Sequence, residues 1–167
     1  MKNRTINIFL ITVLLLLPIY LIWEIYFIDK FYFICPVEYK RDIVVRSDSR
    51  GDGDFFTRRN GNRRHAGIDL EAPEGTKVRA VKAGRILEAT FHRGLGNYVE
   101  ILHPDRLVTI YGHLSKIYTK KGNIVRQGQV IGEVGKTGNA NHPLIQPHLH
   151  FEIRDYGKPL NPSDYLD

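Results

Sequence analysis

Two hydrophobic patterns divide the chain. Residues 6–23 carry no charge and are mostly Ile, Leu, Phe and Val, whereas beyond residue 65 the apolar residues form short runs that Gly, Pro and Asp interrupt. The first pattern predicts a membrane-spanning helix, because an α-helix of that length, rising about 1.5 Å per residue, covers roughly 27 Å of hydrocarbon. The second predicts many short β-strands joined by tight turns. We therefore expect one N-terminal transmembrane helix followed by one all-β domain.

Charges at the two ends of the apolar run predict its orientation. Lys2 and Arg4 precede the run, whereas Glu24 and Asp29 are among the charged residues that follow it. Positive charges favour the cytoplasmic side, so we expect the N-terminus in the cytoplasm and the domain on the periplasmic or extracellular side. A cleavable signal peptide is the alternative, but no small-residue cleavage site follows the run closely. The sequence predicts an uncleaved, single-pass anchor in the cell membrane over residues 1–28.

The segment after this anchor is charged and irregular. Residues 29–50 are interpreted as a stalk and residues 51–167 as the folded domain. Between Lys40 and Arg64 there are eight basic residues against four acidic ones, in a chain whose formal charge is +6. This excess would favour an anionic neighbour, although a solvated linker explains it equally well. A single cysteine, Cys35, excludes an intrachain disulfide.

Alternation of polar and apolar residues is clearest in the last apolar stretch. In a strand, His148 and His150 fall on one face, while Leu149, Phe151 and Ile153 fall on the other. Packing gives no reason for two neighbouring imidazoles on one face, whereas a metal site or a general base does. The two histidines are therefore candidates for metal binding or acid–base chemistry.

Earlier apolar runs predict a meander of antiparallel hairpins. Glycines and Pro-Asp turns separate these runs, which cover residues 77–81, 84–90, 97–102, 107–114 and 122–132. At the end of the fourth run His113 should share a face with Tyr111 and Thr109. Taken alone, a histidine at a strand end is more often a surface residue than a functional one.

A histidine and a carboxylate lie four residues apart in His65-Ala66-Gly67-Ile68-Asp69. On an extended strand the two side chains would be about 13 Å apart, too far to share an ion. A kink or bulge near Gly67 would bring them together. A surface histidine beside a turn aspartate is the alternative.

Five motifs, taken in chain order, resemble those of the lysostaphin-type zinc endopeptidases, the LytM-like peptidases of family M23. They cover about residues 55–165 and are His65-x-Gly67-x-Asp69, Ala72-Pro73-x-Gly75-Thr76, Tyr111-Gly112-His113-Leu114, Gly128-Gln129-x-Ile131-Gly132 and Pro147-His148-Leu149-His150-Phe151-Glu152. The resemblance implies a mostly antiparallel all-β domain of the lysostaphin-like, duplicated hybrid motif type.

The resemblance also implies roles for five side chains. His65, Asp69 and His150 match the zinc ligands of the family, while His113 and His148 match its two catalytic histidines, so Zn²⁺ is the expected cofactor. A histidine near neutral pH can remove a proton from water or hydrogen-bond a developing oxyanion. We expect His148 to be the base and His113 its partner, although the two roles could be exchanged.

The activity that the resemblance implies is hydrolysis of peptide bonds in peptidoglycan, either in cross-bridges or in cross-linked stem peptides. The expected partners are these peptides and the membrane. We expect no nucleic acid partner, and the sequence does not identify a protein activator. Glu152 shares a face with the paired histidines and could orient a ligand histidine or be a surface carboxylate. Residues 139–147 form a longer connection than is usual in the family, so we expect a loop at the rim of the site.

Two other classes of protein share parts of this pattern. A non-catalytic LytM-like regulator or scaffold of cell-wall hydrolases would have lost its zinc, and the complete set of five side chains argues against that. A biotinyl or lipoyl carrier domain would share the short strands and the Gly-Gln-x-Ile-Gly turn, but Lys136 lacks the flanking motif of a modified lysine. The sequence therefore predicts a zinc metalloendopeptidase.

Overall fold

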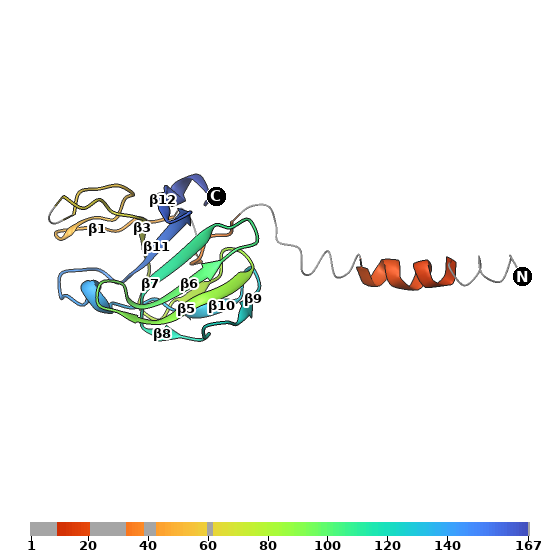
Figure 1. The fold of residues 1–167 in the computed structure, drawn as a ribbon. Helices are drawn as coiled ribbons and strands as arrows, with labels where there is room; N and C mark the ends of the chain where they lie inside the picture. Colours follow the sequence, from red (N-terminus) through yellow and green to blue (C-terminus); the bar gives the residue numbers. More distant parts are fainter. Residues whose placement is uncertain (1–9, 21–32, 39–42, 60–61, 167) are drawn as a thin grey trace, which may run out of the picture. The chain divides into compact units, whose positions relative to one another are not determined.

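The computed structural model describes residues 10–20, 33–38, 43–59 and 62–166. The chain separates into two compact units, Met1–Lys30 and Phe31–Asp167. In the first unit residues 10–20 are helical (Figure 1), and the rest of the predicted anchor lies outside the described residues. Within those described ranges, no helix is both long and apolar enough to span a membrane.

The second unit is built on a seven-stranded sheet in which all described pairs are antiparallel (Figure 1). Its strand order is β12-β11-β7-β6-β5-β9, and β3 pairs with β11 beside this path. The bounds are β3 Ile68–Glu71, β5 Gly84–His92, β6 Gly96–Leu102, β7 Val108–Leu114, β9 Ile124–Val125, β11 His148–Asp155 and β12 Lys158–Leu160. The predicted meander is confirmed for β5, β6 and β7, which are neighbours in both sequence and space.

Smaller elements complete the unit. A three-stranded antiparallel sheet has the order β4-β10-β8, and β1 pairs with β2 in a hairpin. Their bounds are β1 Ser47–Asp48, β2 Gly51–Asp52, β4 Lys77–Arg79, β8 Lys116–Ile117 and β10 Val130–Glu133, and two 3₁₀ turns are η1 Gly138–Ala140 and η2 Pro162–Asp164. The expectation of a mostly antiparallel all-β domain is confirmed.

One face of β11 lies in the core and the other carries polar side chains. Leu149, Phe151 and Ile153 are fully buried among apolar residues. The Phe151 ring lies 5.4 Å from the ring of Tyr111, its register partner on β7. Because side chains alternate along a strand, burial of these three apolar residues turns His148 and His150 to the opposite face.

Described parts of the predicted stalk pack against this unit. Phe33 and Val37 are buried in the core cluster. Further along, Val45 forms an isolated bridge with Leu70 of β3, and the next residue, Arg46, is buried. The side chain of Arg46 therefore reaches the polar face where β3 and β11 meet.

Candidate metal centre and active-site cleft

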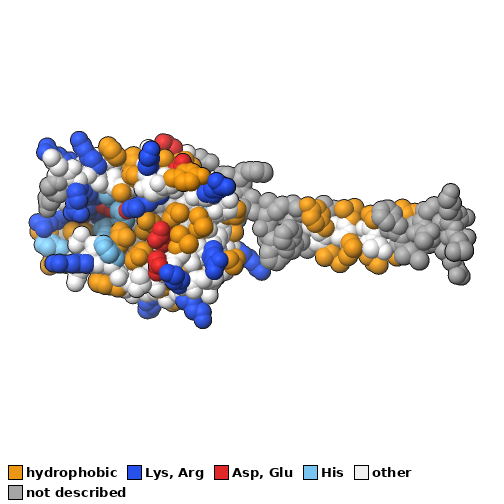
Figure 2. Space-filling model, in the orientation of Figure 1, with side chains coloured by type: hydrophobic (Ala, Val, Ile, Leu, Met, Phe, Trp, Pro, Cys, Tyr) orange, Lys and Arg blue, Asp and Glu red, His pale blue; other side chains and the backbone are white. Residues whose placement is uncertain are grey.

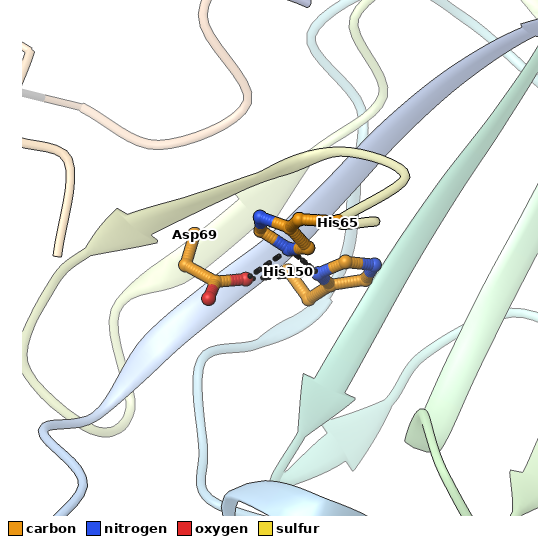
Figure 3. A group of neighbouring side chains, drawn as sticks. All are labelled: His65, Asp69 and His150. Carbon is orange, nitrogen blue, oxygen red and sulfur yellow. Dashed lines mark hydrogen bonds and ion pairs between the residues drawn. The ribbon is translucent and has the colours of Figure 1, made fainter. Parts of the chain in front are cut away.

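Three potential metal-ligand atoms face one another on the polar side of β3 and β11 (Figure 3). His65 Nε2 lies 3.0 Å from Asp69 Oδ1 and 3.0 Å from His150 Nδ1. Asp69 Oδ1 and His150 Nδ1 are 2.8 Å apart. All three side chains are buried. The structure thus brings together the three residues that the resemblance to M23 peptidases matches to zinc ligands.

A bend before β3 and the pairing of β3 with β11 produce this convergence. In the register His150 stands opposite Asp69. The chain bends at Gly67, and this bend brings His65 back towards Asp69. The sequence predicts such a bend if the two residues are to share an ion. A Cβ atom at Gly67 would lie 2.1 Å from the Phe151 carbonyl oxygen, so glycine allows the bend to pass close against β11.

The two histidines of this group are oriented by hydrogen bonds on their other ring nitrogens. Nδ1 of His65 donates to the backbone carbonyl of Asp54 at 2.9 Å, which leaves its Nε2 free to bind a metal. Nε2 of His150 lies 2.9 Å from Glu152 Oε1, and Arg154 binds the second oxygen of Glu152 at 2.6 Å. Glu152 therefore positions His150, which was one of its two expected roles.

Two arginines hold the carboxylate of Asp69. The Nη2 atoms of Arg46 and Arg59 lie 3.0 Å and 2.9 Å from Asp69 Oδ2, while Oδ1 faces the two histidines (Figure 3). Arg46 is also paired with Asp48 at 2.6 Å. Sequence reasoning missed both arginines. Their position in a basic segment indicated an anionic partner, but no spacing signal connects residues 46 and 59 with residue 69.

The donor set fits a zinc ion. Two imidazole nitrogens and one carboxylate oxygen are the ligands of many catalytic zinc sites, which leave a fourth position open. Zinc–ligand bonds of about 2.0–2.2 Å in a tetrahedron separate the donor atoms by about 3.3–3.6 Å, so spreading of a few tenths of an ångström would suffice. Burial alone would raise the pKa of Asp69, but hydrogen bonds with His150 and His65 outweigh it and hold that pKa well below its usual value.

His113 and His148 lie beside these three residues. Their ring centroids are 5.0 Å apart, and the ring of His113 lies 5.7 Å from that of His150. Each Nδ1 atom donates to a backbone carbonyl, of Thr137 at 2.8 Å for His113 and of Gln146 at 2.7 Å for His148. A carbonyl oxygen only accepts, so each neutral ring keeps an unprotonated Nε2.

Burial keeps both of these rings neutral. It lowers the pKa of His113 to about 3, with further lowering from the neighbouring imidazoles of His150 and His148. The pKa of His148 is lowered by burial as well. Two proton acceptors therefore stand beside the candidate metal centre at neutral pH, with His148 Nε2 3.9 Å from Asp69 Oδ1.

His113 does not share the face of Tyr111, so the expectation from strict alternation is wrong. Tyr111 is fully buried and its hydroxyl accepts the Val81 N–H at 3.0 Å, whereas the ring of His113 contacts His148 on the opposite face. Two features explain the difference. His113 has a φ of 61°, and the register of β7 with β6 shifts near this point. Such an irregularity redirects a side chain at the end of a strand.

A cleft of about 420 Å³ opens over these residues. His65, Asp69, His113, His148 and His150 all line it. Residues 139–147, expected as a rim loop, contribute lining side chains at positions 139, 140 and 145. Figure 2 shows Lys and Arg side chains gathered around histidine side chains at this end of the unit.

Comparisons with known proteins find related peptidases. DD-carboxypeptidase/endopeptidase Mpg of Neisseria meningitidis serogroup B is 47% identical over 100 residues, which are 60% of this chain and 22% of Mpg. Peptidoglycan DD-endopeptidase ShyA of Vibrio cholerae is 42% identical over 97 residues, 58% of this chain and 22% of ShyA. The chain thus spans about a fifth of the length of these curated relatives.

A solved structure and a family model also match the chain. The crystal structure of a zinc-containing peptidase from Vibrio cholerae aligns with a TM-score of 0.63 and 31% identity, covering 77% of this chain and 38% of that one. Residues 63–162, which hold all five site residues, match the model of Peptidase family M23. The chain belongs to peptidase family M23.

Proposed function

We propose that this protein is a zinc-dependent endopeptidase that hydrolyses peptide bonds in peptidoglycan. The observation that carries the proposal is the convergence of His65 Nε2, Asp69 Oδ1 and His150 Nδ1 within 3.0 Å of one another, beside two neutral histidines. The names of Mpg and ShyA support the reaction and the substrate class.

Three residues of the chain would hold an ion, and two others would move a proton or position water. His65, Asp69 and His150 would hold Zn²⁺, which supplies Lewis acidity that polarises a scissile carbonyl and makes a water molecule more acidic. His148, through its unprotonated Nε2, takes one proton of the attacking water and returns it to the leaving amine. His113 positions that water by accepting a hydrogen bond from its other O–H with the equivalent atom. The two histidines could exchange these roles.

Location is part of the proposal. Anchoring of residues 1–28 in the cell membrane, with the peptidase domain on the periplasmic or extracellular side, would place the cleft next to the cell wall. The uncharged run at residues 6–23 and the basic Lys2 and Arg4 before it support this arrangement. Protease accessibility of the domain in intact and permeabilised cells tests it.

The activity is tested with the full chain in a non-ionic detergent. Zinc per chain is measured by elemental mass spectrometry, and purified peptidoglycan is then followed for new amine termini. One zinc per chain together with new amines, both removed by a chelator and restored by zinc, is the expected result. A chain without zinc and without cleavage would favour a non-catalytic regulator or scaffold of cell-wall hydrolases instead.

A further inference from the structure

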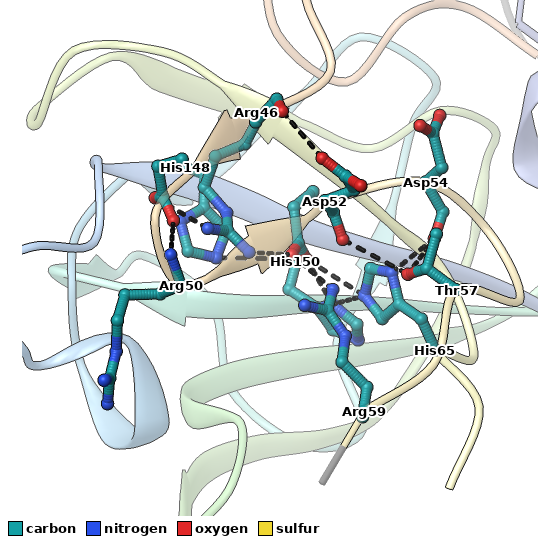
Figure 4. Close-up of polar contacts among 12 residues, drawn as sticks. Arg46, Arg50, Asp52, Asp54, Thr57, Arg59, His65, His148 and His150 are labelled. Carbon is teal, nitrogen blue, oxygen red and sulfur yellow. Dashed lines mark hydrogen bonds and ion pairs between the residues drawn. The ribbon is translucent and has the colours of Figure 1, made fainter.

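One side of the cleft is lined by arginines from residues 46–59 and 62–64. We refer to these six arginines as the arginine wall; they are Arg46, Arg50, Arg58, Arg59, Arg63 and Arg64. Among the described residues that line the cleft, Asp69 is the only acidic one. Figure 4 shows three of the six, Arg46, Arg50 and Arg59, in the neighbourhood of His65, His148 and His150.

Backbone hydrogen bonds fix this segment to the strand that carries the metal-site carboxylate. The N–H of Arg46 donates to the Asp69 carbonyl at 2.8 Å, and the N–H of Asp69 donates to the Gly53 carbonyl at 2.8 Å. The N–H of His65 donates to the carbonyl of Thr57 at 2.9 Å and so holds Thr57 beside His65. The arginine wall is therefore part of the fold and holds a defined position over the cleft.

The six arginines fall into two groups. Arg46 and Arg59 are bound to Asp69, as described above. Among the described residues, no carboxylate pairs with the side chain of Arg50, Arg58, Arg63 or Arg64, all of which are exposed. Arg58 donates to the Asn62 side chain at 3.3 Å, a neutral acceptor. Four cations without a carboxylate partner on one side of the cleft favour an anionic ligand there.

The geometry points to an acidic ligand, and we propose that the arginine wall binds free carboxylates of the substrate peptide. This inference rests on the proposed function. A guanidinium group matches a carboxylate with two parallel hydrogen bonds, so several of them beside the reaction site would select a peptide that carries carboxylates near the cleaved bond. A cross-linked stem peptide with free carboxyl groups fits this requirement, and a neutral cross-bridge of uncharged residues does not.

The test compares two substrates that differ only in charge. One is a cross-linked peptide dimer released from peptidoglycan with its carboxylates free, and the other is the same dimer with those groups converted to primary amides. With the zinc-loaded full chain we expect kcat/KM to be about tenfold lower for the amide form, because each lost contact is a charge-assisted hydrogen bond. High salt should narrow the difference.

Variants locate the effect in the arginine wall. R50Q combined with R63Q removes two side chains that no other described residue binds, and should bring the ratio of kcat/KM for the two dimers close to one. The matched control is R85Q, an exposed arginine on β5 outside the cleft lining, which should leave the ratio unchanged. A ratio near one for the unmodified protein would overturn the inference while the peptidase function stands.

Absence of cleavage by the unmodified protein would instead contradict the proposed function. The affinities for the two dimers would then test the inference. Fluorescence anisotropy of the two labelled dimers should show tighter binding of the carboxylate form, and R50Q/R63Q should remove that preference. Equal affinities would overturn it. The inference is also overturned if R50Q/R63Q keeps the preference but no longer binds vesicles of anionic lipid, since the arginines would then contact the membrane surface.

Discussion

Replacement of Gly67 by alanine tests how the bend before β3 builds the metal centre. The added Cβ would lie 2.1 Å from the Phe151 carbonyl oxygen and 2.8 Å from Glu152 Cγ, whereas ordinary contacts begin at 3.4 Å. The bend would have to move away from β11 by about 1.3 Å, which is the difference between 3.4 and 2.1 Å. Metal–ligand distances tolerate only about 0.2 Å, so His65 would leave its place beside His150.

We expect G67A to lower the free energy of unfolding by about 3 kcal/mol and zinc affinity by at least about tenfold. Chemical denaturation measures the first quantity, and competition with a chromophoric chelator measures the second. G94A is the matched control, because the Cβ there would meet only exposed side chains, the ring of His92 at 3.3 Å and Asn139 Nδ2 at 3.6 Å. A folded G67A protein with unchanged zinc affinity would refute the role given to the bend.

Three further substitutions test separate parts of the structure. E152Q leaves His150 with an uncharged acceptor, so zinc affinity should fall by about 10–100-fold in the chelator assay; unchanged affinity would mean that Glu152 does not position the ligand. Y111F leaves the buried backbone N–H of Val81 without the hydroxyl that accepts it at 3.0 Å. The free energy of unfolding, measured by chemical denaturation, should fall by about 1–3 kcal/mol; an unchanged value would mean that water replaces the hydroxyl. Hydrogen bonds, above all from Lys77, lower the pKa of Glu133 from 4.5 to about 2. Ionised Glu133 therefore stabilises the fold fully above about pH 4.5 and progressively less towards pH 2, where wild type and E133Q should become equally stable; a pH-independent difference would contradict this.

Much of the fold follows from local patterns in the sequence. The alternation at His148 to Ile153 predicts both the core face and the polar face of β11, because one register satisfies all of these residues. The glycine-separated runs predict β5, β6 and β7 as neighbours. The same pattern does not indicate that β8 and β10 join β4 in a second sheet, since such pairings depend on how distant strands meet.

The candidate site is only partly readable from sequence for two physical reasons. His113 faces the site through a backbone conformation with φ of 61°, which no alternation rule anticipates. Arg46 and Arg59 reach Asp69 because residues 46–59 fold back over β3, and a basic segment by itself gives no such contact. The approach of His65 to Asp69 could be predicted because Gly67 between them permits the required bend.

Zinc content and peptidoglycan cleavage, measured in paired variants, separate the three residues that would hold zinc from the two that would move the proton. H150A should lose both stoichiometric zinc and activity, whereas H148A should keep about one zinc per chain and lose turnover. H142A, which alters a loop histidine, is the control and should retain both. Release of new amine termini by H150A and H148A alike, or loss of zinc from H148A, would contradict the assignment.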